Sequence, residues 1–193
     1  MINKLTDEFG DSWYVTNRTD EISEERNRGF EKVSFEQFKK DFLNNPTGIS
    51  IDENPEEIYN NLIIPFRATA GSAGYDFFAP CDIDLQPGED ILIPTGIKVY
   101  MKQDEKLEIS PRSGLGTKFY LRLSNTIGKI DSDYFNNQDN EGHIFIKIRN
   151  EGFKACYIEK GKAFAQGSFE RYLLSDGDTF TGNKRISGMG STG

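Results

Sequence analysis

The sequence predicts an all-β fold of the jelly-roll type with a short α-helical extension at the N-terminus. From Leu62 onward, short segments such as residues 97–101 and 144–148 alternate apolar and polar positions or are rich in β-branched residues. Turn signals such as residues 86–89 separate these segments, and no helical period of useful length occurs between Leu62 and Gly193. Many short strands at close spacing are typical of β-sandwiches and jelly rolls.

The first 33 residues are polar with isolated aromatic residues, and we expect them to form a loosely ordered leader. Ser34 then begins a helix, because Gln37 three residues later completes a capping box. Apolar residues at helical spacing form the buried face of this helix: Phe35, Phe38, Phe42 and Leu43. The turn signal at residues 45–48 ends it.

A second short helix is expected after Asn54, because Pro55 suits the first helical position. We therefore divide the chain into an acidic N-terminal extension (residues 1–60), a jelly-roll core (61–182) and a mobile glycine-rich arm (183–193). Residues 1–60 carry 7 basic and 14 acidic residues, whereas the rest carries 16 and 17, so the extension holds nearly all of the net charge of −8. We interpret the extension as an appendage that packs on the core.

Composition argues against several functional classes. The longest apolar run is too short to span a bilayer, and the N-terminus lacks the apolar centre of a secretory signal, so we expect a cytoplasmic protein. Lysines and arginines are dispersed among carboxylates, which predicts no nucleic-acid surface. Cys81 and Cys156 show no metal or redox spacing and are expected to be reduced. His143 has no second histidine for a metal site and is expected to be structural.

Five short blocks that contain glycine lie in one order along the chain and indicate a nucleotide site assembled from scattered loops. They are Ala73-Gly74-Tyr75-Asp76, Ser110-Pro111-Arg112-Ser113-Gly114, Gly128-Lys129-Ile130-Asp131-Ser132-Asp133-Tyr134, Gly161-Lys162-Ala163-Phe164-Ala165-Gln166 and Gly188-Met189-Gly190-Ser191-Thr192-Gly193. Each block alone could be an ordinary turn, or for the last a flexible end. Taken together, the order, spacing and chemistry of the blocks resemble the trimeric dUTP diphosphatases, or dUTPases, over residues 63–193.

The resemblance implies a jelly-roll subunit of the dUTPase-like β-clip type and a homotrimer whose active sites combine loops of more than one chain. It also implies that the chain hydrolyses dUTP to dUMP and pyrophosphate with Mg²⁺. That reaction limits uracil incorporation into DNA and supplies dUMP for dTMP synthesis. Hydrolysis at phosphorus needs a positioned water, a base and charge stabilisation on the phosphate oxygens.

By resemblance, Asp131 is the general base that orients the water attacking the α-phosphate. A turn aspartate after a strand would explain Asp131 alone, but it would not explain the aromatic Tyr134 three residues later. Tyr134 would lie against the sugar, where a 2′-hydroxyl would clash or lack a partner. The pair therefore implies selection of deoxyribose.

The resemblance assigns the phosphates to Arg112, Ser113 and Gly114, because a guanidinium, a hydroxyl and turn amides suit phosphate oxygens. Asp76 would hold magnesium through water, an outer-shell role suited to an ion that keeps much of its hydration. The phosphates of the substrate would bring this metal. Gln166 matches a glutamine near the α-phosphate.

Uracil recognition is assigned by resemblance to the hairpin at residues 125–130, where Asn125, Gly128 and Ile130 would contact the nucleotide. Cytosine would leave buried groups unpaired, at about 1–3 kcal/mol per group. A turn without a ligand is the alternative interpretation of this segment. The C-terminal arm would close over the nucleotide through five residues: Arg185, Met189, Gly190, Ser191 and Thr192.

The sequence departs from the family pattern in three places. Lys162 and Ala163 replace a pair that is usually acidic and basic. Met189 stands where the family usually has a phenylalanine that stacks on uracil, and we expect lower affinity because such stacking contributes about 1–3 kcal/mol. Residues 135–141 follow Tyr134 where many relatives have one residue, and we expect residues 136–140 within this segment to form an exposed loop. It is either a tolerated surface insertion or a contact for a neighbouring subunit or a regulator.

Two other functions remain open at this point. A dCTP deaminase-like enzyme shares the broad fold and an arginine-serine block, but its chemistry needs a glutamate that moves protons at the ring, and the Asp131 to Tyr134 pattern favours hydrolysis at phosphorus. The other alternative is a dUTPase-fold protein whose main role is regulation of a protein partner. Residues 1–60 or the loop at 135–141 would then bind that partner.

Overall fold

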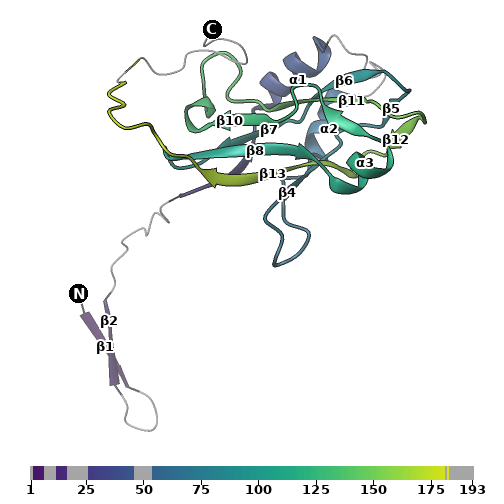
Figure 1. Ribbon diagram of the computed structural model, residues 1–193. Coiled ribbons are helices and arrows are strands. Elements are labelled where there is room, and N and C mark those ends of the chain that lie inside the picture. Colours follow the sequence, from purple (N-terminus) through teal and green to yellow (C-terminus); the bar gives the residue numbers. More distant parts are fainter. Residues whose placement is uncertain (1, 7–11, 17–25, 46–53, 181, 183–193) are drawn as a thin grey trace.

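The computed structural model describes residues 2–6, 12–16, 26–45, 54–180 and 182, and within them the chain is mostly β-strand (Figure 1). The strands are β1 (Ile2–Thr6), β2 (Ser12–Thr16), β3 (Gly29–Lys32), β4 (Tyr75–Phe78), β5 (Ile83–Leu85), β6 (Asp90–Pro94), β7 (Ile97–Tyr100), β8 (Glu105–Pro111), β9 (Leu121–Leu123), β10 (Gly128–Asp131), β11 (Phe145–Asn150), β12 (Cys156–Ile158) and β13 (Ala163–Arg171). The helices are α1 (Phe35–Leu43), α2 (Pro55–Asn60), α3 (Ser113–Lys118) and the 3₁₀ turn η1 (Ser132–Tyr134).

Two antiparallel sheets build the core. A four-stranded sheet has the order β10-β8-β13-β4, and a three-stranded sheet has the order β6-β11-β9. The two-stranded pairs β12-β5 and β3-β7 extend this framework, and β1 pairs with β2. The predicted all-β fold with a few helices is confirmed.

The apolar core lies where the inner faces of these sheets meet. Leu107 and Ile109 from β8 belong to the same buried cluster as Ile93 from β6, Ile148 from β11 and Phe77 from β4. Along β11, buried and exposed residues alternate, as expected for a strand with one face on the core. Burial of each large apolar side chain contributes about 1.5–3 kcal/mol.

Both predicted helices are present with the predicted first residues. The Ser34 hydroxyl accepts a 3.2 Å bond from the Gln37 amide at the start of α1. The Asn54 side chain accepts a 3.0 Å bond from the Glu56 amide at the start of α2, with Pro55 in the first position. These caps satisfy amides that a helix leaves without an acceptor in its first turn.

The apolar face predicted for α1 is confirmed for two of its four residues. Phe38 and Phe42 are buried and form a second, smaller cluster with Val33 and Ile58. Leu43 is 48% exposed.

The expectation of a loosely ordered leader is wrong for residues 29–33. β3 pairs with β7 along its whole length, and Val33 is buried. Phe30 packs on the rings of Phe77 and Phe169, with centroids 5.7 and 5.4 Å away. A lone aromatic residue carries no periodic signal, so this packing depends on partners far along the chain.

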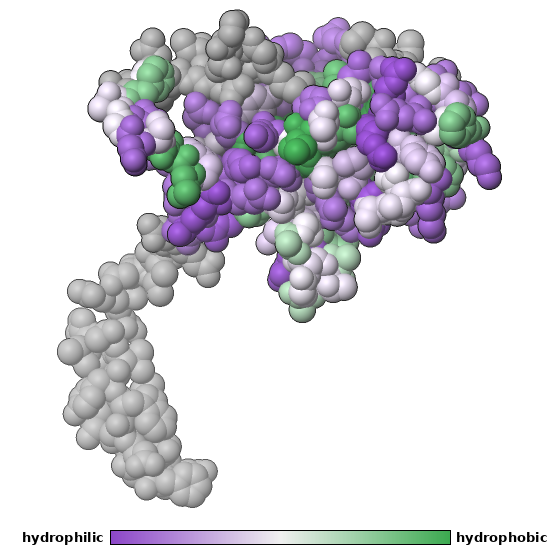
Figure 2. All heavy atoms as spheres, viewed as in Figure 1, coloured by the Kyte–Doolittle hydropathy of each residue, from purple (hydrophilic) through white to green (hydrophobic). Residues whose placement is uncertain are grey.

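Apolar side chains are also exposed on the segment that follows β13. Leu173 is 96% exposed and Phe180 is 87% exposed. Figure 2 shows part of this apolar surface at the left, on the segment that is yellow in Figure 1. In the described part of the chain, no helix has the length and apolar character needed to cross a membrane. Cys81 and Cys156 are buried and free, as expected.

Candidate active site

A cavity of about 350 Å³ opens between the two sheets, on the side of β10. Such a volume is in the range of small-molecule sites. Its walls come from six elements and the connection between β9 and β10: Leu92, Ile109, Leu123, Ser124, Asn125, Gly128, Lys129, Ile130, Asp131, Tyr134, Phe145, Ile146 and Lys147. Figure 2 shows apolar surface near the middle of this face, where β10 and β8 lie in Figure 1, with hydrophilic surface around it. We call this cavity the β10 pocket.

The segment before β10 is not the hairpin that the sequence predicted. β9 pairs with β11 in one sheet, whereas β10 pairs with β8 in the other. Between them, the amide of Thr126 donates to the Leu123 carbonyl at 3.0 Å, and the amide of Ile127 donates to the Asn125 carbonyl at 2.8 Å. Because the flanking strands enter different sheets, this turn crosses between the sheets and forms one wall of the β10 pocket.

Five residues that the sequence assigned to the base, the sugar and the catalytic water line this one pocket: Asn125, Gly128, Ile130, Asp131 and Tyr134. Asp131 is the last residue of β10 and is exposed, whereas Tyr134 ends η1 and is 3% exposed. The Tyr134 hydroxyl donates to the His143 carbonyl at 3.0 Å and accepts from Asn140 Nδ2 at 2.8 Å. The structure thus brings together the whole predicted base and sugar set within the described residues.

A second group forms where β4, β13 and β8 run side by side. Gln166 on β13 lies opposite Asp76 on β4 and opposite Ser110 on β8. Arg112 Nε lies 3.4 Å from Asp76 Oδ1. The Asp76 side chain is only 10% exposed, while that of Arg112 is 44% exposed. The residues that the sequence predicted to meet the metal (Asp76), the α-phosphate (Gln166) and the phosphates (Arg112) therefore lie together at the end of β8.

The block that contains Arg112 is a helix start and not an ordinary β-turn. Arg112 is the N-cap residue of α3, and Ser113 and Gly114 are its first two residues. The sequence showed no helical period of useful length after Leu62, and α3 has only six residues. A second cavity of about 470 Å³ lies here and is lined by Pro111, Arg112, Ser113, Gly116, Thr117, Tyr120, Arg122, Leu123 and Thr126. Guanidinium and hydroxyl groups on its walls suit an anionic ligand.

Gly74 is a further residue of this second group, and the sequence assignment gave it no role of its own. A Cβ atom at this position would lie 2.7 Å from Gln166 Oε1, closer than real side chains approach. Glycine therefore lets the Gln166 side chain lie against the backbone before β4. The only sign of this residue in the sequence was its position in the first block that contains glycine. By contrast, Leu92 and Lys147 line the β10 pocket from β6 and β11 and carry no signal in the sequence.

The two groups are far apart within one chain. Asp131 lies opposite Lys106 on β8, whereas Asp76 lies on the rung that contains Ser110. Four residues along the strand and three strand spacings across the sheet separate the Cα atoms of Asp131 and Asp76 by about 20 Å.

Charged side chains on the rungs between the two groups pair with one another. Lys106 Nζ lies 2.7 Å from Glu108 and 3.3 Å from Glu170. The hydrogen bond from Lys106 to Glu108 raises the pKa of Lys106 and lowers the pKa of Glu108. Lys106 therefore stays positively charged at the position of β8 that pairs with Asp131.

The predicted contacts of the C-terminal arm lie outside the described residues: Arg185, Met189, Gly190, Ser191 and Thr192. Within the described part of the chain, no group of three or more His, Cys, Asp or Glu residues is arranged to hold a metal ion. The residue that the sequence predicted to meet a metal, Asp76, lies beside Arg112.

Comparison with known proteins places residues 60–191 in a family whose description is dUTPase. The deoxyuridine 5′-triphosphate nucleotidohydrolase of Lactococcus lactis is 47% identical over 131 residues, which cover 67% of this chain and 87% of that protein. The protein of the same name from Clostridium novyi is 40% identical over 111 residues, which cover 58% of this chain and 74% of that protein.

Solved structures show the same likeness. The dUTPase from Streptococcus mutans is 35% identical, has a TM-score of 0.57 and covers 77% of this chain and 99% of its own. A mutant dUTPase from phage phi11 of S. aureus, which coordinates a structural Mg(II) ion, is 22% identical with a TM-score of 0.52. It covers 63% of this chain and 92% of its own, and at this identity it supports the fold alone.

Proposed function

The chain belongs to the dUTPase family, and we propose that it hydrolyses dUTP to dUMP and pyrophosphate with Asp131 as the general base. The observation that carries the assignment is the β10 pocket, because Asn125, Asp131 and Tyr134 line one cavity of suitable size. In this proposal the pocket holds the uracil and deoxyribose of the substrate. The α-phosphate then lies at the rim near Asp131.

Asp131 orients a water molecule toward the α-phosphorus and accepts one of its protons. A new bond forms between the water oxygen and the α-phosphorus, and the bridging bond to the β-phosphate breaks, so pyrophosphate leaves with the electron pair. Asp131 suits this role because it is exposed at the end of β10 and lines the pocket.

Substrate selection is assigned to two walls of the pocket. The turn at residues 123–127 offers Asn125 and backbone groups to the uracil edge, with Gly128 and Ile130 beside it. Cytosine presents the opposite donor and acceptor at its fourth ring position and leaves these groups unpaired. The Tyr134 ring excludes a ribose 2′-hydroxyl.

The phosphates are assigned to the second group of residues. Arg112 and Ser113 line one cavity there, with Gly114 following at the start of α3, and Gln166 lies one strand away. The guanidinium of Arg112 is half-exposed, so it is accessible to phosphate oxygens. The C-terminal arm supplies further contacts from Arg185, Met189, Gly190, Ser191 and Thr192 as it closes over the nucleotide.

The residues present fit a magnesium ion that arrives with the substrate. The Asp76 carboxylate is largely buried beside Arg112, and the described residues hold no cluster of three or more ligands, which suits contact through bound water and not an all-protein cage. Bound Mg²⁺ would neutralise charge on the phosphate oxygens. Asp76 would hold the ion through water, and Arg112 is the neighbouring cation that would orient the same phosphates.

We further propose that the active site is shared between copies of the chain in a homotrimer. Asp131 and the phosphate residues must contact the triphosphate of one nucleotide, each within hydrogen-bond reach. The separation of about 20 Å between the two groups does not allow this within one subunit. A second copy that brings its β4 and β8 ends to the β10 pocket would complete the site.

The test is product analysis of the purified protein with Mg²⁺ and, separately, dUTP, dCTP, dTTP and UTP. We expect pyrophosphate from dUTP alone. Ammonia release from dCTP would instead support a deaminase. Absence of product from all four nucleotides would overturn the proposed activity.

A further inference from the structure

We propose that the N-terminal helix α1 and the loop at residues 136–143 form a support that holds Tyr134 in place, with Asn140, His143 and Asp41 as positioning residues. We call this loop the support loop. The inference rests on the proposed function of the β10 pocket. It goes beyond that function because α1 lies outside residues 60–191, the part that matches the family.

The first observation concerns the two ends of the Tyr134 side chain. Its ring belongs to the wall of the β10 pocket, whereas its hydroxyl is held by the support loop. The hydroxyl accepts a 2.8 Å bond from Asn140 Nδ2 and donates a 3.0 Å bond to the His143 carbonyl. Asn140 Nδ2 also lies 3.3 Å from that carbonyl. Two groups, which also bond to each other, therefore restrict the orientation of the ring through its hydroxyl.

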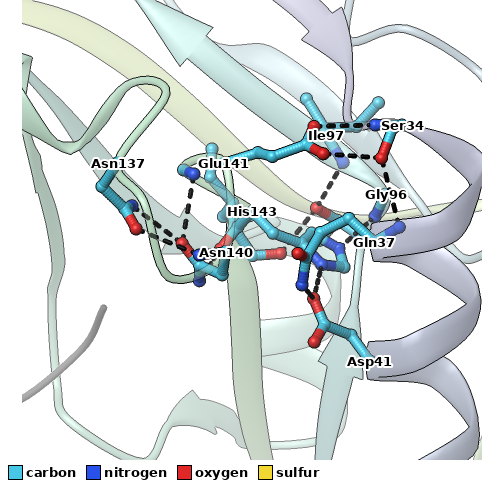
Figure 3. A network of polar contacts seen from close by, with 12 residues as sticks. Ser34, Gln37, Asp41, Gly96, Ile97, Asn137, Asn140, Glu141 and His143 are labelled. Atoms are coloured by element: carbon cyan, nitrogen blue, oxygen red, sulfur yellow. Dashed lines mark hydrogen bonds and ion pairs between the residues drawn. The ribbon is translucent and has the colours of Figure 1, made fainter. Parts of the chain in front are cut away.

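The second observation concerns His143, which joins the support loop to α1 (Figure 3). Its side chain is fully buried, and the Gly96 amide donates to Nε2 at 2.7 Å. Nδ1 therefore carries the proton, and it donates to Asp41 Oδ2 on α1 at 2.6 Å. The ring also packs between Phe38 and Phe145, with centroids 6.3 and 4.5 Å away. The imidazole thus has one tautomer and one orientation, and His143 is structural as expected.

The third observation is a second connection between the support loop and α1 (Figure 3). The carboxylate of Glu141 accepts bonds of 2.9 and 2.6 Å from the amide and hydroxyl of Ser34, the N-cap residue. Burial alone raises the pKa of Glu141, but the bonds from Ser34 and the charge of Lys98 outweigh it and hold the pKa below its usual range. The amide of Ser34 thereby finds its acceptor in Glu141, while Gln37 donates to Asp41 instead. A capping box would also have the Gln37 side chain accept from the Ser34 amide, and this part of the prediction is wrong.

The conformation of the support loop agrees with a tight fit. Asn136 and Glu141 adopt positive φ values of 54° and 57°, and Gly142 has φ 81°. A Cβ atom on Gly142 would lie 2.6 Å from the Tyr134 carbonyl. Asn137 is 6% exposed, so the expectation of a wholly exposed loop is wrong at this residue. Glu141 and His143 of this loop contact the N-cap residue of α1 and α1 itself in the same chain.

The proposed exclusion of the ribose 2′-hydroxyl depends on how firmly the Tyr134 ring is held. A ring rejects ribose only if it cannot move aside, because a mobile wall would accommodate one extra oxygen at little cost. The hydrogen bonds of Asn140 and His143 restrict the Tyr134 ring, and α1 restricts His143 through Asp41. Loss of this support is therefore expected to lower the ratio of kcat/KM for dUTP to that for UTP in a protein that still folds.

Asn140→Asp in the full-length protein tests this step. The substitution keeps the oxygen that accepts from Asn137 Nδ2 and the Gly142 amide, but it removes the amide donor. The single hydroxyl proton of Tyr134 cannot then serve both the new carboxylate and the His143 carbonyl. We expect the ratio of kcat/KM for dUTP to that for UTP to fall about tenfold. Hydrogen exchange of amides in the support loop should accelerate.

The matched control is Gln138→Glu, which adds the same charge to an exposed position in the same loop. It should leave both the selectivity ratio and the exchange rates unchanged. At Asp41, the substitution to Asn retains an oxygen that can accept from His143, so Asp41→Asn should keep most of the selectivity that Asp41→Ala loses. Addition of Tyr134→Phe to Asn140→Asp should cause little further loss, because both changes act through one hydroxyl.

The outcomes separate the two ideas. A wild-type protein that releases no pyrophosphate from dUTP would overturn the proposed function, while hydrogen exchange would still report whether Asn140 holds the loop. An active wild-type protein whose Asn140→Asp variant keeps its selectivity ratio would overturn the support role. Equal losses in the Asn140→Asp and Gln138→Glu variants would also overturn it, because charge alone would then be the cause.

Discussion

Arg112 Nε lies 3.4 Å from Asp76 Oδ1, so a half-exposed guanidinium covers a carboxylate that is almost buried. The two residues come from different blocks of the sequence and meet because β4 and β8 both pair with β13. The ion pair keeps a cation over the carboxylate proposed to meet magnesium. Arg112 is therefore expected to orient phosphates and to balance the charge of Asp76.

The Arg112→Lys substitution should lower kcat/KM for dUTP by about 10- to 100-fold. Lysine keeps the charge but loses the planar donors that match phosphate oxygens. Steady-state kinetics with dUTP and Mg²⁺ would measure this effect. Arg171→Lys is the matched control, because Arg171 is 73% exposed, pairs with Asp104 and lies at the far end of β13 from the residue that pairs with Pro111 beside Arg112. An Arg112→Lys variant with wild-type kinetics would remove Arg112 from the phosphate site.

The Asp131→Asn substitution should reduce kcat by about 10²- to 10⁴-fold, the usual contribution of a general base. The amide keeps the size of the side chain but cannot accept the proton, so dUTP should still bind. Single-turnover kinetics and calorimetric titration with dUTP would separate these two effects. Asp176→Asn, the same change at an exposed residue after β13, should be silent. Wild-type turnover without the Asp131 carboxylate would rule out this base.

A mixture of two inactive variants should regain activity if the site is shared between copies. Asp131→Asn subunits retain the phosphate group of residues, and Arg112→Ala subunits retain Asp131. Refolding them together should form mixed trimers in which some sites combine both intact halves. Hydrolysis of dUTP by the mixture, compared with each variant alone, measures this recovery. No recovery in demonstrably mixed oligomers would place each complete site within one chain.

The stability of the protein should decrease in acid partly through Glu105, which is 4% exposed. The hydrogen bonds from Arg28 hold the pKa of Glu105 below its usual range. A depressed carboxyl pKa contributes stability that is present above the unfolded-state value of about 4.3 and is lost as pH falls through the folded-state value. The free energy of unfolding in urea should therefore fall below about pH 4.3 through this pair.

The Glu105→Gln variant provides the check. It should be less stable than wild type at pH 7 and should show a shallower decline in acid, because it has no carboxylate to protonate. Glu170→Gln, at a more exposed residue on β13, should keep the wild-type slope. Parallel acid profiles for wild type and Glu105→Gln would show that this pair does not contribute.

The Phe38→Ala substitution should destabilise the protein by about 3–5 kcal/mol, the cost of a large cavity in a packed cluster. Phe38 lies on α1 and is fully buried in a cluster with Val33, Phe42 and Ile58 of α2. Leu43→Ala on the same helix is the control, because Leu43 is 48% exposed and should cost about 0.5 kcal/mol or less. Urea unfolding would measure both values. A small loss for Phe38→Ala would mean that the N-terminal extension packs only weakly on the core.

The sequence by itself determined the local elements of this protein. Ser34 and Asn54 cap their helices as predicted, since a capping bond joins residues two or three positions apart. The alternation at residues 144–148 predicted β11, because the faces of a strand repeat every two residues. The blocks around Arg112 and Asp131 indicated the candidate site, since their chemistry is legible in short segments.

The tertiary structure decided which of these segments meet. Entry of β9 and β10 into different sheets opened the β10 pocket, and the order β10-β8-β13-β4 set Asp131 and Asp76 at opposite edges of one sheet. The partner of His143 is Asp41, 102 positions earlier, and no local pattern encodes such a pair. Local geometry follows from backbone dihedrals and side-chain spacing, whereas contacts between distant residues follow from how the sheets and helices bury their apolar faces together.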